Sequence, residues 1–557
     1  MNDIDDRTDA FRPYTWNSVR DHEGGGSPGG GQPGHVDRRQ FLRGLTAAGA
    51  LVGSGGVLAA CSSGAGSPGA SGSPSAAGAP RRGGDLKVGL TGGSGSDTLD
   101  PHNGLTYLDT ARAQGLYQPL LQLNTKAQAE FVLAEDISPH GSTSQWVIRL
   151  RPGITFHDGK PLTADDVIFT LRRIVNPKAP LTGATPLGPI DVKGLKAMDK
   201  HTVLVPMTSP YGSFLDQLAY WYYLYIVPAG FDPKKPNGTG PFKYQSFTPG
   251  QRSVFVRNPN YWRSGLPYVN SLTIIDFSDS ASLQNALTTG VIHGAGALEG
   301  PQITALKSSP GVKTVVSHTG AITPFTMRVD QAPFDDIRVR QAMRLLVDRP
   351  QLINSALNGY ATVGADVSSP FDPNYDTSLH RAQDIAQAKH LLKQAGHQNL
   401  TVQLVTSPVA TGTVAMATVL QQQAKAAGVT ISLKTVDPTT FFGPNYLHWT
   451  FSQDFYNYSP YLAQVAQSLL PTSPFNETHW HLPKYISLYH QANATANAAT
   501  RKQIEHEMQL IDFNEGGYII PAFIDALDAY STKIAGYSAA RVGQPLSDFD
   551  FEHYWFT

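Results

Sequence analysis

Cysteine and charged residues are scarce in this chain of 557 residues. A single cysteine can form no internal disulfide and cannot supply a zinc cluster. Charged residues make up 16% of the chain, against about 25% in a typical soluble protein. Because 43 Lys and Arg residues are balanced by 44 Asp and Glu residues, there is no basic excess to neutralise a nucleic-acid backbone. We therefore expect no nucleic-acid partner.

Signatures of catalysis are also missing. The stretch Gly92-Gly93-Ser94-Gly95-Ser96 lacks the final glycine of a Gly-x-Ser-x-Gly nucleophile turn. The stretch His506-Glu507-Met508-Gln509-Leu510 has leucine where a His-Glu-x-x-His zinc motif has its second histidine. His479 and His481 offer two imidazoles, but a pair of surface histidines explains them better than a metal site. We expect a protein that is not an enzyme and holds no metal or cofactor.

The first 60 residues are typical of an export signal. Residues 1–37 are polar and rich in glycine, and Arg38 and Arg39, followed by Phe-Leu-Arg, resemble the twin-arginine signal. Residues 44–60 are apolar but rich in Ala and Gly, and they are shorter than the roughly 20 apolar residues that span a membrane. They end in Leu-Ala-Ala-Cys61, which resembles a bacterial lipobox. Cys61 is therefore expected to carry a lipid; the alternative is a buried free thiol.

Residues 61–82 are predicted to be a flexible linker, because Gly, Ser, Ala and Pro dominate them. A lipid on Cys61 followed by such a linker would hold the protein at the outer face of the cytoplasmic membrane, in the periplasmic or extracytoplasmic space. Residues 1–60 contain six basic and seven acidic residues, so the exported part is electrically balanced. This balance argues against electrostatic capture of a strongly charged polymer.

The remaining residues predict a mixed α/β body, for which 41% hydrophobic residues supply an ample core. Strands are expected over 85–90 and 146–151. Thr163, followed three residues later by Asp166, resembles a capping box and predicts a helix that continues to residue 174.

A second predicted helix begins at Asp335 or Asp336, and its apolar side has helical spacing: Val339, Ala342, Met343 and Leu346. A strand over 400–406, a helix over 413–427 that stops at Gly428 and a strand over 429–433 form a βαβ unit. This unit predicts a parallel sheet in the second half of the chain.

Six ordered segments resemble the extracellular family 5 solute-binding proteins of peptide and nickel ABC importers. The longest matches the family signature from Leu150 to Val167. The other matching segments are Thr98-Leu-Asp-Pro-His102, Gly115-Leu-Tyr-Gln-Pro-Leu120, Gly238-Thr-Gly-Pro-Phe242, Arg257-Asn-Pro-Asn-Tyr-Trp262 and Pro333-Phe-Asp-Asp-Ile-Arg-Val-Arg-Gln-Ala342.

The resemblance implies a two-lobed periplasmic-binding-protein-like fold of type II with an extra subdomain in the first lobe. By this analogy lobe I covers 84–295 and 525–557, its subdomain covers about 118–235, and lobe II covers 296–524. The implied function is capture of a small solute, a peptide or a peptide-like compound, and its delivery to ABC permease subunits with cytoplasmic ATPases. The protein is expected to be a monomer.

The charged anchors of peptide-binding relatives are not found at the matching positions. The resemblance implies that Leu105 and Tyr107 line the cleft, and it places Tyr456 where relatives hold the peptide amino group with an acid. Asp454, two residues earlier, is the available substitute. Near Thr411, the stretch 408–411 has no cation for a peptide carboxylate. A buried charged terminus without a partner costs several kcal/mol, so a plain dipeptide is disfavoured.

Aromatic residues replace these charges. The resulting candidate ligand-binding residues are Leu105, Tyr107, Trp221, Thr411, Asp454, Phe455, Tyr456, Asn457 and Tyr458. We expect a ligand held by aromatic stacking and by hydroxyl or amide hydrogen bonds, with Tyr107 and Tyr456 facing it. The alternative is that these rings pack in the core. Other open alternatives are a receptor for a sugar-like, aromatic or metal-chelate ligand, a surface sensor that does not transport, and an exported hydrolase.

Overall fold

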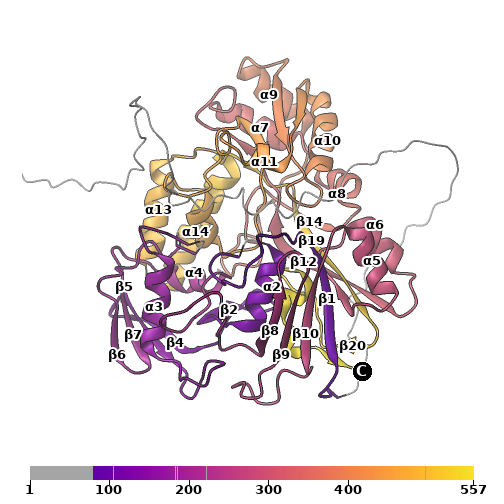
Figure 1. Ribbon diagram of the computed structural model, residues 1–557. Helices are drawn as coiled ribbons and strands as arrows, with labels where there is room; N and C mark the ends of the chain where they lie inside the picture. Colours follow the sequence, from indigo (N-terminus) through magenta and orange to yellow (C-terminus); the bar gives the residue numbers. More distant parts are fainter. Residues whose placement is uncertain (1–78, 105, 182, 185, 221, 496) are drawn as a thin grey trace, which may run out of the picture. The chain divides into compact units, whose positions relative to one another are not determined.

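The computed structural model describes residues 79–557 except 105, 182, 185, 221 and 496. Its largest sheet has, in this order, the strands β12 (Val312–Ile322), β19 (Ala522–Ser531), β11 (Gly294–Ala295), β1 (Asp85–Thr91), β10 (Ser271–Phe277), β9 (Arg252–Arg257) and β8 (Phe242–Thr248). Strand β14 (Ala361–Val363) also pairs with β19. Strand β1 (Asp85–Thr91) confirms the strand predicted over 85–90, and it pairs in parallel with β10 (Ser271–Phe277). In Figure 1, β8, β9, β10 and β1 run side by side in this sheet.

The sheet joins segments that are far apart in the sequence. Strand β19 (Ala522–Ser531) pairs antiparallel with β11 (Gly294–Ala295) and with β12 (Val312–Ile322). The β12–β19 ladder loses its register between Ser317 and Ala321, so residues 318–320 form a bulge. A bulge bends its strand and redirects side chains. The C-terminal part of the chain therefore completes a sheet that begins near residue 85.

A separate four-stranded sheet has the order β4-β5-β7-β6, from Ala134–His140, Ser142–Leu150, Thr202–Pro206 and Lys196–Asp199. Strand β5 confirms the strand predicted over 146–151, although β5 ends at Leu150, one residue before the predicted end. Helix α3 (Ala164–Ile174) packs beside this sheet (Figure 1). Its predicted cap is present, because the backbone N–H of Thr163 donates to Asp166 at 2.8 Å and its hydroxyl donates at 2.9 Å.

The predicted βαβ unit is confirmed. Strands β15 (Thr401–Thr406) and β16 (Thr430–Thr435) pair in parallel, and α10 (Thr413–Ala424) with a 3₁₀ turn (Lys425–Ala427) connects them. Gly428 ends this segment at a φ of +79°, a left-handed conformation that glycine adopts without steric cost.

Helix α7 (Ile337–Leu345) packs in the same core as the βαβ unit. Asp336 caps it by accepting from the N–H of Arg338 at 2.8 Å. The four apolar side chains predicted for its buried face are fully buried: Val339, Ala342, Met343 and Leu346. Helical spacing alone therefore identified the side of the helix that packs.

Two arginines form ion pairs with one buried carboxylate in this structure. Arg349 donates to both carboxylate oxygens of Asp366 at 2.9 Å, and Nε of Arg381 lies 2.5 Å from the same carboxylate. Buried ions are tolerated only when they are paired in this way.

The other helices and strands complete the fold of the described residues. They are α2 (Tyr107–Leu116), β2 (Leu121–Leu123), β3 (Ala129–Phe131), α4 (Phe214–Tyr220), β8 (Phe242–Thr248), β9 (Arg252–Arg257), α5 (Ser280–Thr288), α6 (Gly300–Leu306), β13 (Phe325–Met327), α8 (Arg349–Leu357), β14 (Ala361–Val363), α9 (Ile385–Gln394), α11 (Pro438–Phe441), β17 (Phe451–Gln453), α12 (Tyr461–Ser468), α13 (Pro483–Ala494), α14 (Ala498–Glu515), β18 (Tyr518–Ile519), β20 (Ile534–Ala535), α15 (Pro545–Phe549), the 3₁₀ turn η2 (Phe551–His553) and β21 (Trp555–Phe556). Among the residues described, no helix is both long and apolar enough to cross a membrane.

Candidate functional site

A cavity that is partly open to solvent is lined by segments that are distant in the sequence. Its walls come from the start of α2, the end of β12 with the residues that follow, the loop before α10, the stretch after β17, and β19. The lining residues are Tyr107, Ala297, Leu298, Thr319, Ala321, Ile322, Thr323, Ala410, Thr411, Phe455, Tyr456, Asn457, Ile524, Asp525, Ala526, Leu527, Gly543 and Pro545. Most of them are apolar or hydroxylic, which is typical of a pocket for a small organic ligand.

Five of the residues proposed from the sequence line this cavity together: Tyr107, Thr411, Phe455, Tyr456 and Asn457. Tyr107 is the first residue of α2, where Thr106 caps the helix by accepting from the N–H of Asp109 at 3.1 Å. The Tyr107 ring meets that of Phe549 edge-on with centroids 6.5 Å apart. Burial raises the pKa of Tyr107 to about 12, so its hydroxyl stays protonated and can donate a hydrogen bond.

Tyr456 is among the residues that line the cavity, although it is only 2% exposed, and its hydroxyl is engaged within the protein. The hydroxyl donates to Oε1 of Glu477 and contacts the carbonyl of Phe475 at 3.3 Å. Its backbone exchanges hydrogen bonds of 2.8 and 2.9 Å with Ile322 on β12. These contacts fix the Tyr456 side chain and engage its hydroxyl, so any contribution of Tyr456 to ligand binding comes from its ring.

Two other proposed residues lie outside the lining. Asp454 is fully buried, where Tyr446 donates to its Oδ2 at 2.8 Å and the N–H of Phe455 donates to its Oδ1 at 2.7 Å. Tyr458 is buried against Phe371, with ring centroids 5.6 Å apart. A Cβ added to Gly320 would lie 2.5 Å from the Tyr458 ring, so only glycine fits in this bulge.

Five positions proposed from the sequence lie outside the described residues and have no structural account here. They are Leu105 and Trp221 of the ligand site, Cys61 of the lipid anchor, and Arg38 and Arg39 of the export signal.

A buried acid pair underlies the 455–457 stretch. Glu477 receives hydroxyl donors from Tyr456 and, at 2.6 Å, from Tyr518. Burial, and then the neighbouring Asp454 carboxyl, raises the pKa of Glu477 well above its usual range. Through its hydrogen bonds with the two tyrosine hydroxyls, Glu477 supports the cavity wall. No sequence signal points to Glu477, since it follows Asp454 by 23 residues.

A second group that the sequence did not indicate is Asp525 on β19. Asp525 is among the residues that line the cavity, and its Oδ1 lies 3.0 Å from Nδ1 of His318 in the β12 bulge. Burial raises the pKa of Asp525. The one signal available was an acid within the apolar run Ala522-Phe-Ile-Asp-Ala-Leu527, which the sequence does not distinguish from a surface position.

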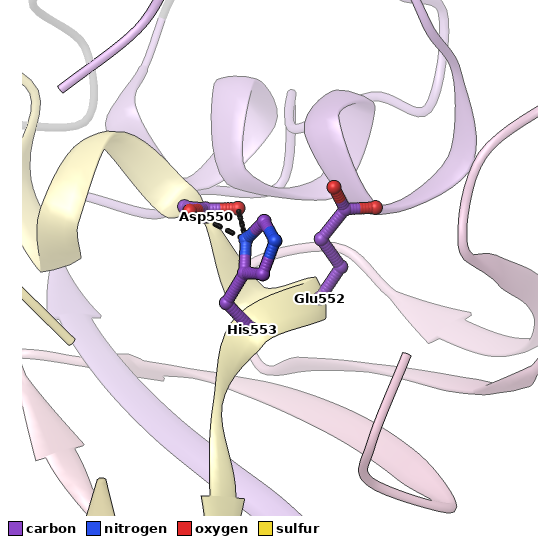
Figure 2. A group of neighbouring side chains, drawn as sticks. All are labelled: Asp550, Glu552 and His553. Atoms are coloured by element: carbon purple, nitrogen blue, oxygen red, sulfur yellow. Dashed lines mark hydrogen bonds and ion pairs between the residues drawn. The ribbon is translucent and has the colours of Figure 1, made fainter. Parts of the chain in front are cut away.

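Asp550, Glu552 and His553 form a third group, shown in Figure 2, away from this cavity. Both oxygens of Asp550 contact Nδ1 of His553, at 2.7 and 2.8 Å. Glu552 is paired with Arg263 and accepts from the hydroxyl of Tyr261 at 2.5 Å. An arginine thus already neutralises the carboxylate that a metal ion would use.

The two histidines weighed as metal ligands lie in a loop and not on a strand. Nε2 of His479 contacts the carbonyl of Leu447 at 2.8 Å, and Nδ1 lies 3.3 Å from Asp330. His481 is exposed. Neither histidine belongs to the acid–histidine group that lies within metal-binding reach in the described part of the chain.

Solved structures of known proteins share this fold. The chain superposes on CtaP (Lmo0135), an ABC transporter substrate-binding protein of Listeria monocytogenes, with a TM-score of 0.75 and 22% identity over 86% of this chain and all of that one. It superposes on the oligopeptide-binding protein AppA of Bacillus subtilis, solved with a nonapeptide, with a TM-score of 0.69 and 20% identity over 86% of this chain and all of that one. These likenesses confirm the expected two-lobed α/β fold of periplasmic binding proteins.

The sequence comparisons identify the family. Residues 129–482 match the bacterial extracellular solute-binding proteins, family 5 Middle. The glutathione-binding protein GsiB of Pectobacterium atrosepticum is 30% identical over 358 residues, which are 62% of this chain and 68% of that protein. The chain belongs to the family 5 extracellular solute-binding proteins, as the sequence motifs indicated.

Proposed function

We propose that this protein is the substrate-binding lipoprotein of an ABC importer. It captures a small solute in the cavity described above and delivers it to the membrane permease. The observation that carries the proposal is the meeting of Tyr107, Thr411 and residues 455–457 around one cavity. These residues come from both of the lobes that the family resemblance implies, so closure around a ligand would bury it between them.

The proposed lobes are 84–295 with 525–557, including a subdomain over 118–235, and 296–524. The boundary proposed between 524 and 525 falls within β19 (Ala522–Ser531). In this account β19 is one of the connections about which the lobes move. The protein binds and releases its ligand unchanged and acts as a monomer.

The proposed ligand is a peptide or peptide-like compound that is not held by the pair of charged anchors that peptide-binding relatives use for the two peptide termini. Support comes from AppA, which was solved with a nonapeptide, and from GsiB, which binds glutathione. The rings of Tyr107, Phe455 and Tyr456 offer stacking surfaces, and Thr411 and Asn457 offer hydrogen bonds. A non-peptide ligand is the second candidate, favoured by the same aromatic lining.

Lipid on Cys61 would keep the receptor close to its permease and raise its effective concentration there. The export signal at Arg38 and Arg39 and the linker over 61–82 belong to the same proposal.

The direct test compares the uptake of a solute by intact cells with the binding of the same solute to the purified protein. Deletion of the coding sequence should abolish uptake of the bound solute by intact cells, and expression of the full chain should restore it. A solute that binds the purified protein tightly but enters deletion cells at the wild-type rate would instead support a surface sensor. Turnover of the bound compound by the purified protein would overturn the receptor account.

A further inference from the structure

We propose that the ligand of this cavity carries a positively charged nitrogen and that Asp525 binds it. The inference rests on the proposed receptor function and names the chemical class of its ligand: a small organic cation, an amine or a guanidine, without a carboxylate that enters the cavity.

The charge of the cavity lining carries the argument. Among the described residues that line it, Asp525 is the only one with a formally charged side chain. The Asp525 side chain is 2% exposed. Removing an ionised carboxylate from water costs several kcal/mol unless a cation compensates it. A ligand cation would supply that compensation, whereas a ligand carboxylate would meet a like charge and no lining cation.

The bulge in β12 places His318 and Thr319 beside Asp525 and Ile524 of β19. Residues 318–320 bulge out of the β12–β19 ladder, and the Thr319 hydroxyl donates to the carbonyl of Ile524 at 2.6 Å. His318 contacts Oδ1 of Asp525 with a side chain that is 72% exposed. Such an exposed imidazole compensates a carboxylate weakly, because solvent screens the pair. His318 therefore orients the carboxylate, and the principal charge partner is the ligand.

The other lining groups suit the same ligand. The aromatic rings of Tyr107, Phe455 and Tyr456 line the cavity that contains the acid. Aromatic faces attract cations through their negative π surface, typically by about 0.5–2 kcal/mol each. Thr319 and Asn457 add neutral polar groups. A carboxylate with aromatic walls and no lining cation is a combination that selects cations over zwitterions and anions.

Matched probes test the inference. Tyramine, N-acetyltyramine and 3-(4-hydroxyphenyl)propionate share one ring and differ in charge, and Leu-Tyr amide, its N-acetyl form and N-acetyl-Leu-Tyr form a longer series. Isothermal titration of the purified protein with each is compared for wild type, Asp525→Asn, His318→Ala and Glu135→Gln. Glu135 is an exposed acid on β4 and controls for net charge. Native mass spectrometry of the same variants with an extract of the source cells then identifies the natural ligand.

The expected result is that the cationic member of a series binds at least tenfold more tightly than its neutral and anionic counterparts. Asp525→Asn should remove that preference, while His318→Ala and Glu135→Gln keep it. Equal losses in Asp525→Asn and His318→Ala would show that Asp525 only anchors the histidine, and would overturn the proposal. A neutral or anionic natural ligand that binds Asp525→Asn as tightly as wild type would also overturn it but leave the receptor function standing. Failure to bind any probe or any extract component would count against both.

Discussion

Ile322 and Tyr456 exchange a pair of backbone hydrogen bonds, from the N–H of Ile322 at 2.8 Å and from the N–H of Tyr456 at 2.9 Å. This pair joins the end of β12 to the stretch that carries Phe455 and Asn457. Ile322 and Tyr456 both line the cavity. The stretch that carries the aromatic residues is therefore joined to β12 through its backbone, and the Tyr456 side chain is held in addition by its hydroxyl contact with Glu477.

Replacing Tyr456 by Ala should weaken affinity for the ligand at least tenfold, about 1.4 kcal/mol, because the substitution removes the stacking surface. Tyr456→Phe keeps the ring and loses only the hydroxyl that donates to Glu477, so it should retain most of the affinity. Titration calorimetry on the two variants separates the contribution of the Tyr456 ring to affinity from that of its hydroxyl. Unchanged affinity in Tyr456→Ala would refute the assignment of this residue to the site.

Replacing Asp366 by Ala should destabilise the protein by about 3–5 kcal/mol, since it leaves Arg349 and Arg381 without their shared carboxylate. Urea unfolding followed by circular dichroism measures this loss. The control is Glu507→Gln, which breaks an exposed pair with Lys484 and should cost less than about 1 kcal/mol. Similar losses in both variants would contradict the view that the buried pair is a structural requirement.

Thermal stability should fall as the pH rises from about 4.5 to about 8, with Glu505 as one cause. Burial, and then the Asp372 carboxyl, raises the pKa of Glu505 to about 8. The folded protein therefore keeps a proton that the unfolded chain releases near pH 4.5. Between these two pKa values the folded state binds more protons, so each rise in pH disfavours folding.

Glu505→Gln removes this titration while keeping an oxygen that can accept from Asn374, which donates at 3.0 Å. Relative to wild type, the variant should gain about 1–3 kcal/mol of stability at pH 9 and little at pH 5. Glu507→Gln, an exposed change on the same helix, should show no such pH dependence. Melting curves at the two pH values decide, and an equal shift at both would exclude Glu505 as the source.

Replacing Cys61 by Ala should release the protein from the membrane fraction, because the lipid would have no attachment point. Cell fractionation and mass spectrometry of the N-terminal peptide report anchoring and acylation separately. Replacement of Arg38 and Arg39 by Lys should leave precursor inside the cell if the twin-arginine route is used. A Cys61→Ala protein that stays with the membrane would contradict lipid anchoring.

Local features of the fold were predictable because their causes are local. The capping box of Thr163 and Asp166 spans four residues, and the stop at Gly428 depends on one backbone conformation. The buried face of α7 follows from the spacing of four apolar residues. Each signal lies within a single element, where sequence spacing and spatial proximity coincide.

The candidate site was predictable only in part, because its charges meet through the tertiary fold. Tyr107 and the 455–457 stretch were proposed from motif resemblance and aromatic content, and they line one cavity. The contact between His318 and Asp525 joins residues 207 positions apart, and it depends on a bulge that sequence pattern does not reveal. Likewise, nothing in the sequence separates a cavity-lining Phe455 from a core-packed Tyr458.

Native mass spectrometry of the purified protein after incubation with an extract of its source cells tests most directly whether one solute is captured in this cavity. We predict a single noncovalent adduct of one ligand per chain that is lost in Tyr456→Ala and retained in Glu507→Gln. The absence of an adduct with every extract fraction, or an adduct of equal intensity in Tyr456→Ala, would contradict the account.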